Sequence, residues 1–211
     1  MRTLPLCVLA GFVTFEGIDG SGKTTVSHLV LEKLRSRGHS VFLTSEPTSG
    51  WLGDLVRRGI QEDVNAITES FLFLADRSVH IGQIRSHLEK GELVLCDRYA
   101  DSTFAYQGAR LVGVLPDPIR FLQNASRGWL LSPDLTILLR VSPELGMNRI
   151  KGRPMKIRFE DLGLLRRVAA NYDRLARSRR FAVLDGARSA QVVSEDAVST
   201  IERRLARRGR T

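Results

Sequence analysis

Cysteine is scarce in this sequence, which has only Cys7 and Cys96 among its 211 residues. Both stand in apolar stretches, LCVLA and LVLC, and their spacing is not that of metal ligands. We therefore expect two buried free thiols, and we exclude a disulfide-stabilised scaffold and a structural zinc site. Free thiols fit the reducing environment of the cytoplasm, where we expect the protein to act.

Long hydrophobic runs are also missing. No apolar stretch approaches the ~18–20 residues that a membrane-spanning helix needs, so we expect no membrane partner. The first 17 residues, MRTLPLCVLAGFVTFEG, superficially resemble a secretion signal. The apolar stretch runs directly into Glu16 and a glycine-rich motif that cleavage would destroy, so we expect a first strand preceded by an N-terminal extension over residues 1–10.

The first two thirds of the chain have no excess of positive or negative charge. Residues 1–140 hold 15 basic and 15 acidic residues, whereas residues 141–211 hold 17 and 8, so the net charge of +9 arises in the last third. Such a charge favours anionic partners. The alternative, which we favour, is that these arginines form solvated helix faces, because RRVAANYDRLARSRR and ERRLARRGR space them at helical intervals. We do not expect a nucleic-acid partner, since interleaved stacking aromatics are missing.

An apolar content of 43% and a charged content of 26% are ordinary for a globular protein and exclude fibrous or disordered chains. Apolar runs of strand length alternate with segments of helical periodicity. The strands are expected at 12–16, 41–44, 93–96, 135–141 and 181–184, and the helices from Gly22 onward and at 52–59, 67–89, 117–127, 143–150, 160–179 and 194–207. This pattern indicates a parallel sheet covered on both faces, within one α/β domain over residues 1–211.

A glycine-rich motif follows the first expected strand and precedes a helix. Residues Gly17-Ile18-Asp19-Gly20-Ser21-Gly22-Lys23-Thr24 match GxxxxGK[ST] at every fixed position. Glycines let backbone N–H groups turn toward phosphate oxygens, and the helix N-terminus adds positive potential. Lys23 would reach the β and γ phosphates, and the Thr24 hydroxyl would ligate Mg²⁺. The motif predicts a phosphate-binding loop but does not specify a reaction.

Asp97-Arg98-Tyr99 ends the third expected strand, at the sheet edge where ligands bind in open α/β folds. Asp97 could hold magnesium or its water shell, and Arg98 could clamp a second phosphate with its two-pronged guanidinium. The alternative is a salt bridge at the strand end. We find no NKxD-type guanine signature of a GTPase, and a motor ATPase would need a longer chain.

Taken together with further short motifs, these features make the sequence resemble the thymidylate kinase family. FEGIDGSGKTT, Glu46-Pro47, FLADR (residues 73–77), Asp97-Arg98-Tyr99 and STFAYQG (residues 102–108) follow in that family's order. The resemblance implies a P-loop NTPase-type fold of three layers, with a five-stranded parallel sheet flanked by helices, and a short lid over about residues 150–160. It also implies Mg²⁺-dependent phosphorylation of dTMP to dTDP by ATP, and a homodimer.

The resemblance assigns roles residue by residue. The ATP-binding residues would run from Gly17 through Thr25, joined by Arg149 on the adenine. Asp19 would bind the deoxyribose and help to fix the acceptor phosphate, which Arg98 would hold. Phe73 would stack on thymine, Arg77 would bind a base carbonyl, and Tyr106 would crowd the ribose 2′ position. The other residues expected at dTMP are Glu46, Pro47, Ser102, Thr103 and Gln107, while Thr24 and Asp97 would hold the metal.

Two departures from the family pattern bear on catalysis. Some members place an arginine directly after the P-loop aspartate, where this chain has Gly20, so the catalytic cation must come from elsewhere; Arg153 and Arg158 of the lid are candidates beside Lys23, Asp19 and Arg98. Ser45 stands where the family often has arginine before Glu-Pro, which puts acceptor affinity in question.

Two alternatives stay open at this point. The first is a P-loop kinase for another acceptor, such as dUMP, although Phe73, Arg77 and Tyr106 together suit a pyrimidine deoxynucleotide. The second is a non-catalytic nucleotide- or nucleic-acid-binding protein. Intact Lys23, Thr24, Asp97 and Arg98 argue against the second.

Overall fold

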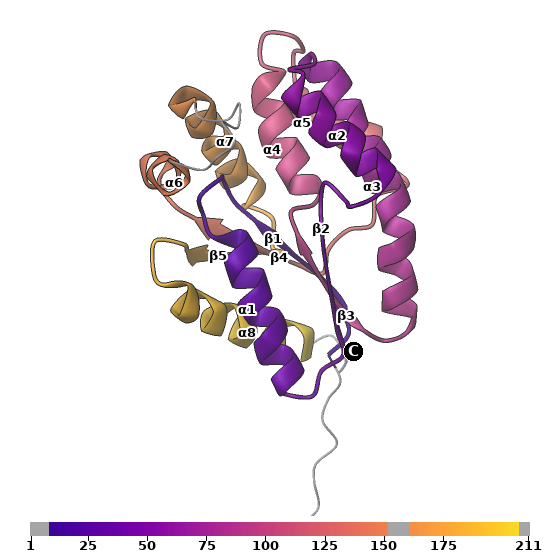
Figure 1. The fold of residues 1–211 in the computed structure, drawn as a ribbon, viewed down its shortest axis with the longest axis vertical. Helices are drawn as coiled ribbons and strands as arrows, with labels where there is room; N and C mark the ends of the chain where they lie inside the picture. The colour runs from indigo at the N-terminus through magenta and orange to yellow at the C-terminus, as the bar shows by residue number, and fades with distance from the viewer. Residues whose placement is uncertain (1–8, 152–160, 207–211) are drawn as a thin grey trace, which may run out of the picture.

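The structure, a computed structural model, describes residues 9–151 and 161–206 (Figure 1). Five strands and eight helices lie within these residues. The strands are β1 (Gly11–Glu16), β2 (Val41–Ser45), β3 (Leu93–Asp97), β4 (Leu135–Arg140) and β5 (Phe181–Asp185). The helices are α1 (Lys23–Ser36), α2 (Trp51–Gln61), α3 (Ala66–Glu89), α4 (Ala100–Arg110), α5 (Pro118–Ser126), α6 (Pro143–Ile150), α7 (Leu162–Leu175) and α8 (Ala190–Ala206).

The five strands form one parallel sheet in the order β2-β3-β1-β4-β5. The chain starts in the middle, moves outward to β2, returns through β3 and then builds the other half. The loops that leave β1 and β3 therefore emerge side by side at the carboxyl edge, at the point where the strand order reverses. The predicted α/β fold with a five-stranded parallel sheet is confirmed.

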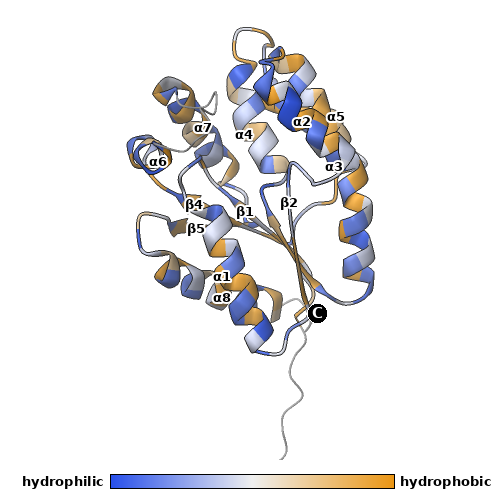
Figure 2. Cartoon of the chain, viewed as in Figure 1, coloured by the Kyte–Doolittle hydropathy of each residue, from blue (hydrophilic) through white to orange (hydrophobic). Residues whose placement is uncertain are grey.

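Helices cover both faces of the sheet, because each face carries apolar side chains (Figure 2). Helices α1 and α8 pack on one face, against a cluster that includes Val13, Phe15 and Ile137. The other face is covered by α3, α4, α5 and α7, over Phe12 and Val94 among others. Helix α2 packs on α3, and α6 packs on α7. None of the described helices is long and apolar enough to cross a membrane.

Helix α4 was missing from the expected helices, although its residues stood in a recognised motif. Every residue from Ala100 to Ala109 is buried, since α3, α5 and α7 surround this helix. A helix without a solvent face shows no amphipathic period, so periodicity could not reveal it. Helix α7 is shorter than expected at both ends and α8 begins earlier, at Ala190.

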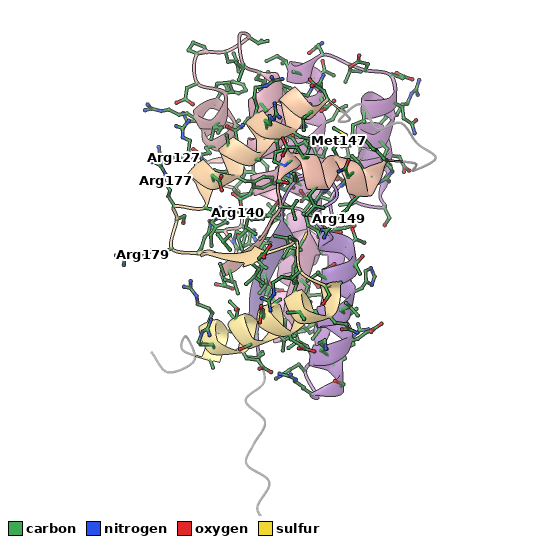
Figure 3. The ribbon with its side chains drawn as sticks, turned by 90° about the vertical axis from the view of Figure 1, so that its left-hand side faces the viewer. Arg127, Arg140, Met147, Arg149, Arg177 and Arg179 are labelled. Carbon is green, nitrogen blue, oxygen red and sulfur yellow. The ribbon has the colours of Figure 1, made fainter. Side chains whose placement is uncertain are left out.

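Cys96 is a buried free thiol as predicted, and burial raises its pKa well above the usual value. Cys7 lies outside the described residues, as do most of the expected N-terminal extension and most of the expected lid. In the basic last third, Arg177 and Arg179 are exposed. They point outward near Arg127, away from Arg149 (Figure 3), as expected for a solvated surface.

Candidate active site

The P-loop motif joins β1 to α1, as its position in the sequence predicted. Lys23 is the first residue of α1, and its ammonium folds back over the loop to donate to the Ile18 carbonyl at 2.8 Å and to Ser21 Oγ at 3.4 Å. The side chain is buried. Burial, helped by the nearby Arg98 guanidinium, lowers the pKa of Lys23 to about 8. A buried cation with few partners is well suited to an anionic ligand.

Gly20 packs so closely against helix α6 that it leaves no room for a side chain at this position of the P-loop. Its φ is +80°, and a Cβ added there would lie 2.2 Å from the carbonyl oxygen of Gly146 in α6. The packing is reciprocal, since a Cβ on Gly146 would lie 2.6 Å from the Asp19 carbonyl oxygen. Helix α6 thus occupies the space that an arginine at position 20 would need.

Thr24 and Asp97 meet across the gap between α1 and the end of β3. The Thr24 hydroxyl donates to Asp97 Oδ2 at 2.6 Å. The other carboxylate oxygen, Oδ1, is buried and has no hydrogen-bond partner among the described residues. A hydroxyl beside a carboxylate with a spare oxygen fits Mg²⁺, which binds through one or two protein oxygens together with water and phosphate. The described ranges contain no group of three or more histidine, cysteine, aspartate or glutamate side chains that could hold a metal ion.

Arg98 lies between the P-loop and α4. Its guanidinium pairs with the Asp19 carboxylate and lies over the Tyr106 ring, 5.2 Å from the centroid. Tyr106 Oη in turn accepts a hydrogen bond of 2.8 Å from the Asp19 backbone N–H. Arg98 itself has a φ of +68°, in the left-handed region that a non-glycine residue rarely adopts. The structure therefore brings Asp19, Arg98 and Tyr106 together, as the sequence motifs required.

A buried network beneath Arg98 was not anticipated. Glu16, the last residue of β1, accepts hydrogen bonds from the Tyr99 backbone N–H at 2.9 Å, from Ser102 Oγ at 2.6 Å and from Tyr172 Oη at 3.0 Å. Arg98 Nη1 donates to the same Ser102 oxygen at 3.4 Å. Ser102, expected at dTMP, thus lies beside Arg98. A charged residue inside an apolar strand was the signal for Glu16, whereas nothing marked Tyr172.

A second buried group surrounds Arg77 on α3. Glu46 Oε2 accepts from Arg77 Nε at 3.0 Å and from Nη2 at 2.6 Å, and Nη2 also donates to Thr103 Oγ1 at 2.8 Å. The third nitrogen, Nη1, is buried without a hydrogen-bond partner in the described part of the chain. His80 completes the group, with Nδ1 3.0 Å from Glu46 Oε1 and Nε2 2.8 Å from Thr44 Oγ1. His80 stands three residues after Arg77, a helical spacing that could have indicated it.

The remaining acceptor-side candidates lie around this group. Phe73 is one turn before Arg77 on α3, is only half-buried, and does not belong to the hydrophobic core on either face of the sheet. Pro47 follows Glu46 through a cis peptide bond. Gln107 is buried farther along α4, where its side chain donates to Glu69 at 2.9 Å. Ser45 is exposed at the end of β2 and pairs in register with Asp97.

Arg149 connects α6 to two loops at the carboxyl edge. Its guanidinium donates to the carbonyl oxygens of Gly20 at 3.3 Å, Gly186 at 2.8 Å and Ala187 at 3.1 Å. In Figure 3 it lies between α6 and the P-loop side of the molecule. The lid candidates Arg153 and Arg158 lie outside the described residues.

Comparison with known sequences agrees with this geometry. The sequence model of the thymidylate kinase family matches residues 15–197. Proteins named probable thymidylate kinase from Methanococcoides burtonii, Methanosarcina barkeri and Methanoculleus marisnigri are 39%, 38% and 43% identical to this chain. The alignments cover 90%, 92% and 82% of this chain and 94%, 97% and 85% of the relatives. With the family model matching most of its length, the chain belongs to the thymidylate kinase family.

Proposed function

We propose that this protein phosphorylates dTMP to dTDP with ATP as the donor. Membership of the thymidylate kinase family makes it an ATP-dependent nucleoside monophosphate kinase, a transferase. The observation that carries the assignment is the arrangement of cations at one sheet edge: Lys23 on the P-loop, Arg98 against Asp19, and Arg77 with a spare buried nitrogen. These are a donor-phosphate site, an acceptor-phosphate site and a site for a base carbonyl. Cytoplasmic action fits this reaction.

The acceptor pocket follows from the two groups of contacts around α4. Asp19 and Tyr106 would meet the deoxyribose, and Arg98 would bind its phosphate. Thr103 and Glu46 hold Arg77 so that Nη1 is left to donate to a base carbonyl, with Phe73 stacking on the ring. Pro47, Ser102 and Gln107 would complete the walls of the pocket.

On the donor side, the loop from Gly17 to Thr25 would bind the ATP phosphates, and Arg149 would lie against the adenine. Thr24 and Asp97 would hold Mg²⁺, which when bound would neutralise charge on the phosphate oxygens. Since Gly20 leaves no room for a P-loop arginine, we propose that Arg153 or Arg158 supplies the further cation for the transferred phosphoryl group.

A homodimer is also part of the proposal. Helices α2 and α3 pack together and expose large apolar side chains, namely Trp51, Leu55, Phe71 and Val79. Exposed apolar residues gathered on one helix pair are typical of an interface between protein chains.

The reaction is tested by measuring ADP release from Mg-ATP with dTMP, dUMP, dCMP, dGMP and UMP offered in parallel. We expect the highest kcat/KM with dTMP, dUMP second, and little turnover of UMP because Tyr106 crowds the 2′ position. A higher kcat/KM for dUMP than for dTMP would favour the alternative acceptor. ATP binding without turnover of any acceptor would favour the non-catalytic alternative.

Phe73→Ala tests the base-binding side of the pocket. We expect the KM for dTMP to rise about tenfold or more, because a stacked aromatic face is lost, while the KM for ATP stays within about twofold. Phe71→Ala, two residues away on the exposed side of α3, is the matched control and should change neither KM. Equal increases of both KM values in Phe73→Ala would remove Phe73 from the acceptor pocket.

A further inference from the structure

We propose that Glu16 is a positioning residue for catalysis, which holds Arg98 in the conformation that binds the acceptor phosphate. Glu16 precedes the P-loop and lies outside the phosphate-binding motif itself. The proposal deepens the function proposed above and rests on it. It assigns to a buried carboxylate the task of fixing an arginine that this carboxylate does not itself pair with.

The first support is the backbone around Arg98. A φ of +68° is unfavourable for arginine and persists only where neighbours impose it. The Arg98 backbone N–H donates to the Phe15 carbonyl at 3.0 Å, and the next N–H, that of Tyr99, donates to Glu16 Oε1 at 2.9 Å. Consecutive residues at the end of β1 thus hold both sides of the turn that carries Arg98.

The second support is the side-chain path from Glu16 to the guanidinium. Glu16 Oε2 accepts the Ser102 hydroxyl at 2.6 Å, which leaves the Ser102 oxygen facing Arg98 Nη1 at 3.4 Å. Tyr172 Oη lies 3.0 Å from Glu16 Oε2 and 2.9 Å from Ser102 Oγ, so α7 adds a third member to this hydrogen-bond network. The contacts with Glu16 and Tyr172 fix the orientation of the Ser102 hydroxyl. Ser102 in turn positions the Nη1 end of the Arg98 guanidinium.

The third support is that burying the ionisable Glu16 side chain lowers the stability of the folded protein. Its side chain is fully buried, and its hydrogen-bond partners among the described residues are Tyr99, Ser102 and Tyr172, none of them a cation. Burial first, and then the nearby Asp101 carboxylate, raise the pKa of Glu16 to about 7. The charged and titratable groups that interact with it electrostatically are Asp101, Arg98, Lys23, Arg77, Arg180, Cys96 and Tyr172. A glutamine would fill the same space without charge, so packing alone does not require a carboxylate here.

The raised pKa of Glu16 predicts how the difference in stability between the wild type and Glu16→Gln changes with pH. Because the pKa of Glu16 is near 7 in the folded protein and near 4.5 in the unfolded chain, the native state holds this proton more tightly. The wild type therefore loses stability relative to Glu16→Gln as the pH rises from about 4.5 to 7, and the difference stays constant above that range. If the ionised carboxylate instead stabilised the fold, the wild type would gain stability relative to Glu16→Gln as the pH rises.

The experiment compares Glu16→Gln with the wild type in thermal unfolding at pH 5 and pH 8 and in steady-state kinetics at pH 8. We expect the Tm of the variant, relative to wild type, to be higher at pH 8 than at pH 5. We also expect about a tenfold rise in the KM for dTMP with a lower kcat, since a displaced Arg98 weakens acceptor binding and alignment. The KM for ATP should stay within about twofold.

Asp134→Asn is the matched control, because it makes the same isosteric change at the opposite edge of the sheet, where Asp134 Oδ2 accepts the Phe12 N–H at 2.8 Å. It should leave the KM for dTMP unchanged. Unchanged kinetics in Glu16→Gln would overturn the proposal, and so would equal losses for ATP and dTMP together with a lower Tm at pH 8. The acceptor preference of the wild type tests the proposed function separately. If the wild type prefers another acceptor, the two proteins are compared with that acceptor.

Discussion

Lys23→Ala is expected to lower the kcat of dTMP phosphorylation by about 10²-fold or more. Phosphoryl transfer spreads negative charge over the oxygens of the transferred group, so catalysis depends on cations placed in advance. Lys23 is buried at the start of α1, where its ammonium is held by the Ile18 carbonyl and Ser21. An alanine removes the cation without filling the space, and water at the loop cannot replace a fixed charge. A loss of 10²-fold corresponds to about 2.7 kcal/mol of transition-state stabilisation.

Steady-state kinetics with saturating ATP and dTMP measure this loss, and circular dichroism establishes that the variant is folded. Lys33→Ala is the matched control on the same helix, since Lys33 is partly exposed and pairs with Glu195 at 3.4 Å. It should retain normal turnover. A kcat near the wild-type value in Lys23→Ala would show that the transferred charge is stabilised elsewhere and would remove Lys23 from catalysis.

The parts of the site that could be predicted from sequence are those carried by short contiguous motifs. The two fixed glycines of the P-loop motif, Gly17 and Gly22, already predict a turn between a strand and a helix, and both have positive φ in the structure. Strand length and helical period placed all five strands within one or two residues. The pairing of Phe73 with Arg77 on one helix face follows from helix geometry alone.

The contacts that could not be predicted join residues far apart in the chain. Tyr172 reaches Glu16 across 156 positions, and nothing in the sequence around either residue refers to the other. The close packing of Gly20 on Gly146 is of the same kind, because it depends on where α6 lies after β4. Motifs therefore predicted which groups would act on the nucleotides, whereas the residues that contact those groups from distant parts of the chain emerged only from the fold.

Glu46→Gln is expected to lower the free energy of unfolding by about 3 kcal/mol, because it leaves a buried guanidinium without its counter-charge. The side chains of Arg77 and Glu46 are 0% and 2% exposed, so water cannot screen the loss. Thr103 supplies only a neutral oxygen at 2.8 Å, and His80 loses its carboxylate partner. With about 2–4 °C of Tm for each kcal/mol in a chain of this size, the Tm should fall by about 6–12 °C.

Differential scanning calorimetry measures the change, with Glu62→Gln as the control. Glu62 pairs with Arg58 on the surface of α2, at 2.7 Å but largely in solvent, so its loss should leave the Tm unchanged. The double variant Glu46→Gln/Arg77→Met removes both charges and should recover most of the stability, but it should lose dTMP turnover because Arg77 is no longer there to bind the base. Such a recovery would separate two effects of Arg77. Its buried charge lowers stability when Glu46 does not balance it, and its Nη1 would bind the base. If Glu46→Gln alone keeps the wild-type Tm, Arg77 does not depend on Glu46 for its charge balance, and the buried pair is not what holds α3 against the end of β2.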